Sequence, residues 1–356
     1  MRIGIFDPYL DDLGGGEKYM LTIAEYLSRN NRVDVFWDNK EDLVKLKERF
    51  SLDTSKLNLV KNIFSPSTSL FKRLFETMKY DAIIFLSDGS IPLVLSKKLY
   101  IHIQQPLEKM QTTSFISKFK LMRVDKFFSN SNYTKSFIDS KFAVKTVVLY
   151  PPIVFRSKKT DKENIILHVG RFRVKNVRSE DYKKQSVMIK VFKKMIDKGL
   201  KDWKFVLAVS IQDKDRKEFE EMKKSAEKYP IEFLINKNNN ELWEIYSKAK
   251  IYWHASGFGE DLNKNPELAE HFGISTVEAM SAGVVPVVIN SGGQKEIVKN
   301  NIDGLLWNSL DELESKTLLL IESNALLNKY SKKAIESANK FNIENFYSEI
   351  DKIILQ

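Results

Sequence analysis

The chain of 356 residues contains no cysteine. Disulfide bonds, zinc–thiolate sites, iron–sulfur clusters and thiol nucleophiles are therefore excluded together. The sequence also lacks any run of about 18 apolar residues, the length that a transmembrane helix needs. The N-terminal stretch reaches Asp7 before an apolar signal-peptide core can form. We therefore do not expect secretion by that route, and we expect a cytoplasmic protein.

The composition is that of a globular protein with a sizeable core. Hydrophobic residues make up 43% of the chain, aromatic residues 12% and charged residues 29%. These fractions exclude a disordered tail, a collagen-like fibre and a low-complexity scaffold. At one domain per about 150 residues, the length predicts about two domains.

The charge is unbalanced toward the basic side. Lys and Arg number 57 against 47 Asp and Glu, which gives a net charge of +10. Such a balance favours an anionic partner, but it does not choose among nucleotide phosphates, nucleic acid and an anionic membrane surface. Dense Lys, Asn and Ile usage is also typical of an AT-rich genome. We find no recognisable nucleic-acid-binding module, so no nucleic acid is expected as a partner.

Short apolar segments alternate with helical patterns along the whole chain. This alternation predicts an α/β fold of parallel sheets covered on both faces. In the first half the expected strands are Arg2–Phe6, Val33–Phe36, Leu57–Val60, Ala82–Leu86, Leu99–Ile103, Lys126–Ser129 and Thr146–Leu149. In the second half they are Asn164–Val169, Phe205–Val209, Ile231–Leu234, Lys250–Trp253 and Val285–Ile289.

The two halves are separated by Tyr150-Pro151-Pro152-Ile153, whose prolines forbid helix and indicate a linker. We therefore expect a domain over residues 1–150 and a second over 151–335. Residues 336–356, with a helical pattern at Ile343–Leu355, are expected to cross back onto the first domain.

Ligands of open parallel sheets bind at the carboxyl ends of the strands. The first such turn is Gly14-Gly15-Gly16-Glu17, which opens a helix. Glycines there let backbone N–H groups approach an anion, and Gly15, Gly16 and Glu17 are candidates for a phosphate or acceptor loop. A plain tight turn explains the same residues equally well.

Basic residues follow the first strand of the second half. Arg171 ends this strand, and Lys183 and Lys184 begin the next helical pattern. An arginine and a lysine that meet in one crevice suit a diphosphate. Alternatively, both lysines belong to a solvated surface.

Ser275 and Glu278 have the spacing of a capping box, which predicts that a helix starts there. In that interpretation the Glu278 carboxylate only caps the helix. In the functional interpretation, the backbone N–H groups of residues 274–277 face a phosphate. The flanking carboxylates Glu270 and Glu278 accept hydrogen bonds from sugar hydroxyls. Gly273 lets the backbone come close to a pyranose.

Several of these segments together resemble family-4 retaining glycosyltransferases, which have the GT-B fold of two Rossmann-like domains. Glu270 and Glu278, separated by seven residues, match the family's paired glutamates. The matching stretches of the second half are HVGRF at 168–172, EHFGISTVEAMSAGVVPVV at 270–288, SGGQKEIV at 291–298 and DGLLW at 303–307. WHASGFGED at 253–261 is similar to a subset that includes dolichol-pathway mannosyltransferases and bacterial polysaccharide enzymes.

The first half matches the family less sharply, through GGGE at 14–17, YIHIQQP at 100–106, SNSNYTK at 129–135 and LYPPI at 149–153. One departure is the extra stretch Val174–Tyr182 between Arg171 and the lysines. Because of it, either Lys183 or Lys184 matches the family's basic residue.

The resemblance implies a role for each matching residue. Glu278 would hold the ribose, and Arg171 with the lysine would bind the diphosphate. Glu270 would contact the donor sugar near the reacting carbon, and His102 would lie near the acceptor unless it is a core histidine. The sugar would face Phe272, Gly273 and Ile274, and the β-phosphate Ser275 and Thr276.

The implied reaction moves a hexose from a UDP- or GDP-linked sugar to an acceptor hydroxyl on a glycan, a glycolipid or a protein-linked glycan, with retention and without a metal or other cofactor. Competing interpretations are a basic nucleic-acid-binding protein, another GT-B enzyme such as an epimerase or a phosphorylase, and an inactive sugar-nucleotide-binding protein. Residues 70–79 and 115–123 mix apolar and basic side chains. They are either ordinary helices or a peripheral contact with an anionic membrane.

Overall fold

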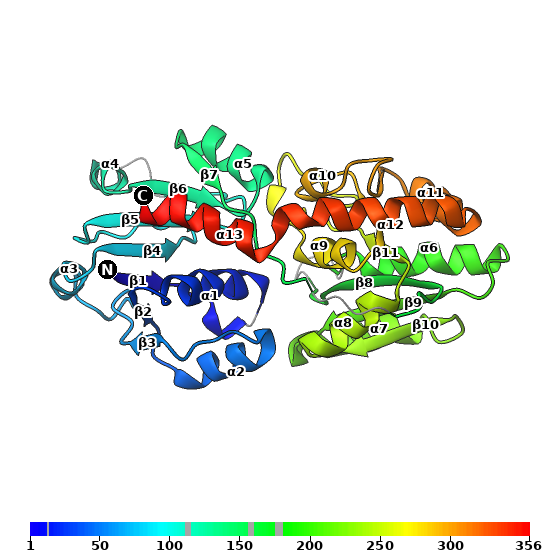
Figure 1. Cartoon of the computed structure of the whole chain (residues 1–356), viewed down its shortest axis with the longest axis horizontal. Helices are drawn as coiled ribbons and strands as arrows, with labels where there is room; N and C mark the ends of the chain where they lie inside the picture. The colour runs from blue at the N-terminus through cyan, green and yellow to red at the C-terminus, as the bar shows by residue number, and fades with distance from the viewer. Residues whose placement is uncertain (13, 111–114, 156–159, 175–180) are drawn as a thin grey trace. The chain divides into compact units, whose positions relative to one another are not determined.

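The computed structural model describes residues 1–12, 14–110, 115–155, 160–174 and 181–356. The chain forms two compact units. Unit 1 consists of Met1–Pro152 and Ile343–Gln356, and unit 2 consists of Ile153–Asn342. Each unit contains one sheet whose paired strands all run parallel (Figure 1). The expected fold class, two Rossmann-like parallel-sheet domains, is confirmed.

The sheet of unit 1 has the strand order β3-β2-β1-β4-β5-β6-β7. Its strands are β1 (Arg2–Phe6), β2 (Arg32–Phe36), β3 (Leu57–Val60), β4 (Ala82–Leu86), β5 (Lys98–Ile103), β6 (Lys126–Ser129) and β7 (Thr146–Val148). Successive residues of β4 enter different apolar clusters: Ile84 packs on one face of the sheet, and Ile83 and Phe85 pack on the other. Both faces are covered, which explains why β4 is apolar throughout.

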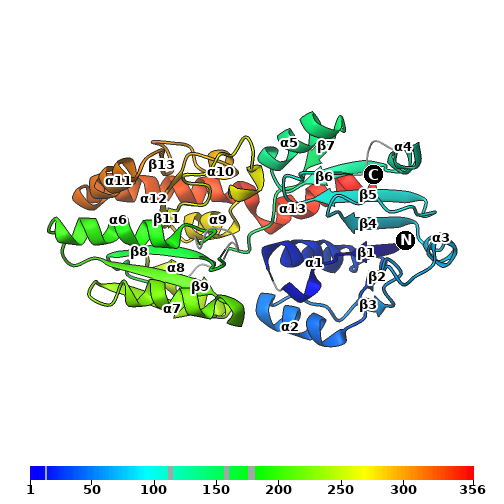
Figure 2. The same cartoon turned by 180° about the vertical axis from the view of Figure 1, so that it is seen from behind.

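The helices of unit 1 are α1 (Gly15–Leu27), α2 (Lys40–Phe50), α3 (Leu70–Thr77), α4 (Phe115–Met122), α5 (Asn132–Phe142) and α13 (Ile343–Ile350). A π-helical turn, Asp351–Leu355, follows α13. This returning segment belongs to the core of unit 1, because Phe346, Ile350 and Ile354 are buried in the same cluster as side chains of α1. Figure 2 shows the ribbon of α13 beside that of α1. The Tyr100 hydroxyl donates to the carbonyl of Ile354 at 3.0 Å, which fixes the segment against β5.

The sheet of unit 2 has the order β10-β9-β8-β11-β12-β13. Its strands are β8 (Ile165–Arg171), β9 (Lys204–Ser210), β10 (Ile231–Ile235), β11 (Ile251–His254), β12 (Val285–Ile289) and β13 (Leu305–Trp307). The sequence did not predict β13, which has three residues and pairs with the end of β12. The segment is too short to show an apolar alternation of its own.

The helices of unit 2 are α6 (Gln185–Asp197), α7 (Arg216–Lys224), α8 (Asn239–Lys248), α9 (Ile274–Ser281), α10 (Gln294–Ile297), α11 (Leu310–Glu322) and α12 (Asn324–Ala338). Side chains of α6, α7, α11 and α12 form one large apolar cluster with the strands. Among the described helices of both units, none has the length and apolar character that crossing a bilayer requires.

The strand order reverses direction between β8 and β11 in unit 2, and between β1 and β4 in unit 1. At such a switch point the connections leave the two neighbouring strands in opposite directions, which opens a crevice at the carboxyl ends. In unit 2 this edge is marked by Arg171 at the end of β8 and His254 at the end of β11. The candidate site is therefore sought there.

Candidate functional site

The carboxyl end of β8 brings the predicted basic residues of unit 2 together. Arg171 is the last residue of the strand and is partly exposed. A Cβ placed on the preceding Gly170 would lie only 3.5 Å from Cγ of Lys183, so the lysine side chain passes directly over the strand end. Lys183 thus lies at the carboxyl end of the strand that Arg171 terminates, at the sheet edge where ligands bind.

The two candidate lysines have different surroundings. The Lys183 ammonium lies 2.7 Å from Oε2 of Glu270. The Lys184 ammonium lies 2.7 Å from Oε1 of Glu260, and its side chain is only 7% exposed. Residues 175–180 of the extra stretch at 174–182 lie outside the described residues. Asp181, at the end of this stretch, accepts hydrogen bonds from the backbone N–H groups of Gln185 and Ser186 at the start of α6. The structure therefore places Lys183, and not Lys184, beside the predicted sugar carboxylate.

The backbone at Lys184 is left-handed, with φ +57°, and precedes the first turn of α6. A non-glycine residue pays roughly 1 kcal/mol or more for this conformation, and glycine does not. Lys184→Ala and Lys184→Gly both remove the ion pair with Glu260, so comparing them isolates the backbone contribution. We expect the glycine variant to be more stable by about 1 kcal/mol, measured by urea denaturation. Equal or greater stability of the alanine variant would contradict this assignment.

Glu270 is held by two groups that contact the same oxygen. Its Oε2 lies 2.7 Å from the Lys183 ammonium and 2.7 Å from Nε2 of His254. Burial by itself would raise the pKa of Glu270, but Lys183 and His254 outweigh burial and hold the pKa well below its usual range. The carboxylate is therefore ionised at neutral pH. Within the described residues, Oε1 of Glu270 makes no hydrogen bond, and the side chain is 18% exposed.

His254 was missed as a site residue, although it lies in the quoted stretch WHASGFGED. Burial lowers the pKa of His254 while Glu270 opposes the shift, so the imidazole is neutral at pH 7. The backbone N–H of Ser256 donates to Nδ1 at 3.4 Å, which leaves the proton on Nε2 to be donated to Glu270. His254 directly follows the expected strand Lys250–Trp253, and this position at the carboxyl end of a strand could have identified it as a site residue.

The start of α9 differs from the capping box that the sequence predicted. The N-cap is Gly273, not Ser275, and no side chain caps the helix. Gly273 has φ +119°, and a Cβ there would lie 2.6 Å from the Gln294 amide nitrogen, so this position requires glycine. The capping interpretation of Glu278 is wrong, because Gly273 starts the helix two residues earlier than a Ser275 cap would.

Fewer N–H groups face outward at this helix start than expected. The N–H groups of Thr276 and Val277 both donate to the carbonyl of Gly273, at 3.0 and 3.2 Å. Those of Ile274 and Ser275 have no acceptor in the described part of the chain. These two donors, together with the positive end of the helix dipole, form the part of α9 suited to an anion.

Glu278 points from α9 toward α8. The Tyr246 hydroxyl donates to Oε2 of Glu278 at 3.1 Å. Burial and the nearby carboxylate raise the pKa of Tyr246 far above its usual value, so the phenol keeps its proton and remains a donor. On the adjacent turn of α9, the hydroxyls of Ser275 and Tyr252 lie 2.7 Å apart. Tyr246 was not predicted, since nothing in the sequence distinguishes it from a core tyrosine.

A glycine turn packs against the segment that carries Glu270. The N–H of Gly293 donates to the Glu270 carbonyl at 2.7 Å. Gly292 has φ +58°, and a Cβ there would lie 2.4 Å from the same carbonyl oxygen. The two glycines therefore fix the backbone of Glu270. The resemblance implied that Phe272 faces the sugar. In the structure its ring packs against the ring of Phe341, with ring centroids 5.3 Å apart.

The predicted site residues of unit 1 lie in its apolar core, as His102 does, or at the start of α1, as Glu17 does. His102 is fully buried between the rings of Tyr19 and Phe128, and its Nδ1 lies 3.2 Å from the Phe128 carbonyl. Burial lowers the pKa of His102 to about 3. These contacts match the core-histidine alternative, and a role beside the acceptor stays a prediction.

The Gly-rich loop of unit 1 is shaped by its own packing. The Glu17 carboxylate accepts a hydrogen bond from the N–H of Gly14 and caps α1. A Cβ on Gly16 would lie 2.2 Å from the amide oxygen of Gln104, so a larger residue would require this side chain to move. Gly15 is the first residue of α1. A phosphate or acceptor function for this loop stays a prediction.

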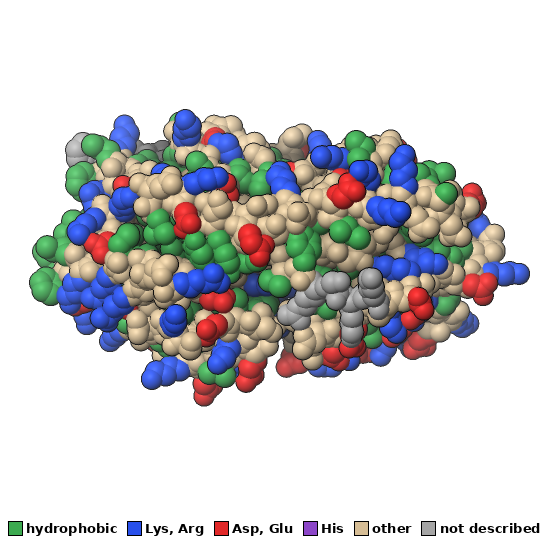
Figure 3. Space-filling view, in the orientation of Figure 1, with side chains coloured by type: hydrophobic (Ala, Val, Ile, Leu, Met, Phe, Trp, Pro, Cys, Tyr) green, Lys and Arg blue, Asp and Glu red, His purple; other side chains and the backbone are tan. Residues whose placement is uncertain are grey.

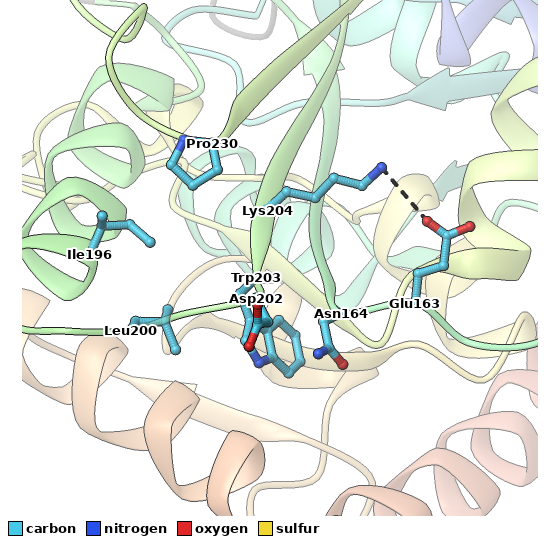
Figure 4. A pocket seen from close by; sticks show the side chains of 8 residues that line it. All are labelled: Glu163, Asn164, Ile196, Leu200, Asp202, Trp203, Lys204 and Pro230. Atoms are coloured by element: carbon cyan, nitrogen blue, oxygen red, sulfur yellow. Dashed lines mark ion pairs between the residues drawn. The ribbon is translucent and has the colours of Figure 1, made fainter.

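In the described ranges, no group of three or more His, Asp or Glu residues is placed to hold a metal ion. A pocket of about 380 Å³ in unit 2 is lined by side chains that include Asn164, Trp203 and Lys204 (Figure 4). These residues lie at the amino ends of β8 and β9. The pocket is therefore at the opposite edge of the sheet from Glu270 and is not part of the candidate site.

Comparison with known proteins adds a family and a set of relatives. The family described as glycosyl transferases group 1 matches residues 151–338, just over half of the chain. A GDP-Man:Man(3)GlcNAc(2)-PP-Dol alpha-1,2-mannosyltransferase of Dictyostelium discoideum is 25% identical over 237 residues, which are 63% of this chain and 45% of the relative. The human enzyme of the same name is 27% identical over 61% of this chain and 45% of its own length. The chain thus matches about half the length of these relatives.

Solved structures share the fold. The superposition on HepE of Anabaena, crystallised in complex with UDP, covers 100% of this chain and 100% of HepE, with a TM-score of 0.72 at 17% sequence identity. Sucrose-phosphate synthase of Thermosynechococcus elongatus covers 100% of this chain and 98% of its own, with a TM-score of 0.70 at 15% identity. At such low identity the likeness concerns the fold.

Proposed function

The chain belongs to the family of glycosyl transferases group 1, and on that premise we propose that it transfers a hexose from a nucleoside-diphosphate sugar to an acceptor hydroxyl with retention of configuration. The observation that carries the proposal is Glu270. Its ionised carboxylate turns one oxygen to Lys183 and His254 and leaves the other without a hydrogen bond among the described residues. That oxygen is an acceptor suited to a sugar hydroxyl.

The diphosphate would lie over the carboxyl end of β8 and the start of α9. Arg171 and Lys183 supply positive charge on one side. The N–H groups of Ile274 and Ser275 supply donors on the other. Fixed charges and dipoles of this kind stabilise the negative charge that develops as the diphosphate departs. No metal ion is required by this scheme.

The nucleoside would be held by Glu278. The two oxygens of a carboxylate can accept hydrogen bonds from both hydroxyls of a ribose. Tyr246 holds one carboxylate oxygen in place from α8, so the side chain is oriented before the ligand arrives. Glu278 and Glu270, near opposite ends of one short segment, then contact the two ends of the donor.

In the reaction the bond between the anomeric carbon and the phosphate oxygen breaks, and a bond from the acceptor oxygen to that carbon forms on the same face. The acceptor's proton passes to the departing phosphate. Lys183 and Arg171 stabilise the leaving group, while Glu270 orients the sugar by its hydroxyls. His254 is a positioning residue in this scheme, because it acts through Glu270.

GDP-mannose is the first donor to test, since the sequence relatives are named as enzymes that use it. UDP-linked sugars follow, since HepE was crystallised with UDP. The relatives' names also point to a lipid-linked glycan as the class of acceptor. We extend both classes to this chain as parts of the proposal.

The proposal is tested with a panel of UDP-, GDP-, ADP-, CMP- and TDP-sugars, by calorimetric binding and by slow donor hydrolysis. We expect one donor to bind and to be hydrolysed. Glu278→Ala should weaken its binding about ten- to hundred-fold, the loss expected for hydrogen bonds to a charged group. Tyr246→Phe removes only the hydroxyl that holds Glu278 and should weaken binding less.

Glu244→Ala is a matched control, because Glu244 lies on α8 near Tyr246 and its side chain is not part of the proposed site. It should bind the donor like the unaltered chain. Absence of binding and hydrolysis for all five carriers at millimolar concentration would overturn the donor site. An equal loss of affinity for the Glu244 and Glu278 variants would overturn the role of Glu278.

A further inference from the structure

Unit 1 exposes a group of large apolar side chains that its own core does not use. Phe71, Phe75 and Met78 form one face of α3 and the residue after it, with the Phe71 side chain 86% exposed. Phe119 and Met122 of α4 and Leu95 are exposed as well. We call these six residues the α3–α4 surface.

Hydrogen bonds join the two helices into one surface. The N–H of Leu95 donates to the Thr77 hydroxyl on α3 at 3.0 Å. Next to it, the Ser96 carbonyl accepts from the Arg123 guanidinium, just after α4, at 2.6 Å. Burial together with the Arg73 charge lowers the pKa of Lys120. The segment 95–96 therefore bridges the helices.

The concentration of aromatic side chains here is not that of an ordinary surface. Among the phenylalanines whose side-chain burial is described, which leaves out Phe115, the exposed ones are Phe71, Phe75 and Phe119, and all three belong to this surface. Isolated apolar residues on a surface need no explanation, but a contiguous group of this kind marks an interaction site. Figure 3 shows green apolar and blue basic side chains together at the end of unit 1 that carries α3.

Basic residues are interleaved with the apolar ones. Lys72, Lys79 and Lys118 are exposed beside the phenylalanines, and Arg73, Lys120 and Arg123 add further positive charge. The acidic residue of α3 is Glu76, and its charge is offset by Lys79 at 2.8 Å. Aromatic side chains interleaved with lysines suit the interface of a bilayer, where the rings enter the headgroup region and the ammonium groups contact anionic lipids.

We propose that the α3–α4 surface docks unit 1 on an anionic membrane. The inference goes beyond the proposed sugar transfer and does not depend on which donor is used. Met78, Leu95 and Met122 shortly precede the amino ends of β4, β5 and β6. Docking there leaves the carboxyl ends of the strands uncovered, which is the edge at which parallel sheets bind their ligands.

The test is co-sedimentation of the full chain with vesicles of phosphatidylcholine, either alone or mixed with phosphatidylglycerol. We expect binding to the mixed vesicles, weakened by salt. Lys72→Glu should lower the partition coefficient more than five-fold, because removing each basic charge near an anionic surface costs about five-fold. Phe71→Ser with Phe75→Ser should lower it at least as much, since both rings lose their insertion.

The matched control is Val44→Ser with Lys47→Glu on α2, an exposed apolar and basic pair away from the α3–α4 surface. This variant should bind vesicles more strongly than the α3–α4 variants. All variants are also compared by thermal unfolding and donor hydrolysis, which should not change. Absence of binding to mixed vesicles, or equal loss in the α2 variant, would overturn the proposal. A dimer in solution that Phe71→Ser dissociates would also overturn it, because the surface would then bind a second copy of the chain.

Discussion

Replacing Lys183 with methionine should lower kcat by about 10²- to 10³-fold, the loss measured elsewhere when one preorganised donor to a developing negative charge is removed. The Lys183 side chain passes over Gly170 at the end of β8, and its ammonium lies 2.7 Å from Oε2 of Glu270. It is thus placed to contact both the diphosphate and the carboxylate that orients the sugar. The measurement is the rate of donor hydrolysis, and later of sugar transfer, at saturating donor.

Lys184→Met is the matched control for this prediction. Its ammonium is bound by Glu260, and its side chain is nearly buried, so it does not reach the proposed diphosphate. We expect a much smaller change in kcat, together with a loss of stability that urea denaturation would detect. If the two methionine variants lost kcat equally, the assignment of Lys183 as the phosphate lysine would be wrong.

Glu270→Gln is expected to reduce kcat by a similar 10²- to 10³-fold while leaving the affinity for the free nucleoside diphosphate almost unchanged. The amide keeps the shape of the carboxylate but removes its charge, which orients the sugar and balances Lys183. The nucleoside diphosphate lacks the sugar that Glu270 contacts. Comparing kcat with the calorimetric affinity for the nucleoside diphosphate therefore separates a sugar role from a general binding role.

Glu260→Gln alters the neighbouring ion pair and is the control for this variant. The pH dependence of stability distinguishes the two further. Because Lys183 and His254 depress the pKa of Glu270 in the folded chain, its ionised form stabilises the fold above the unfolded value of about 4.3, and this contribution is lost as the pH falls. The Glu270→Gln variant should lack that acid-dependent loss. A parallel fall of nucleotide affinity and kcat in this variant would contradict the sugar role.

Much of the fold was predictable because interior strands such as β4 and β12 are apolar on both faces. Segments such as Ala82–Leu86 and Val285–Ile289 stand out from the amphipathic helices beside them. β13 was not predicted because its three residues are too few to show a hydrophobic periodicity. Only the structure shows that it pairs with β12. The two-sheet arrangement followed from the strand–helix alternation restarting after Pro152.

The candidate site was predicted at the level of residue types but not of contacts. Arg171, Lys183 and Glu270 were named, yet their proximity depends on a passage of the lysine over Gly170 that no sequence pattern encodes. The spacing of Ser275 and Glu278 gave a false capping box, because the left-handed Gly273 starts the helix earlier. His254 and Tyr246 contribute through hydrogen bonds to side chains that are distant in sequence.

The division of unit 1 between the two ends of the chain has a consequence for biosynthesis. Its core needs Phe346, Ile350 and Ile354, which are synthesised after the whole of unit 2. Unit 2 is one uninterrupted segment and can close as soon as Asn342 has emerged. The domain that is translated first is therefore completed last. Until α13 has emerged, α1 and β5 lack the apolar cover that this segment provides, and chaperones have an extended interval in which to act on nascent unit 1.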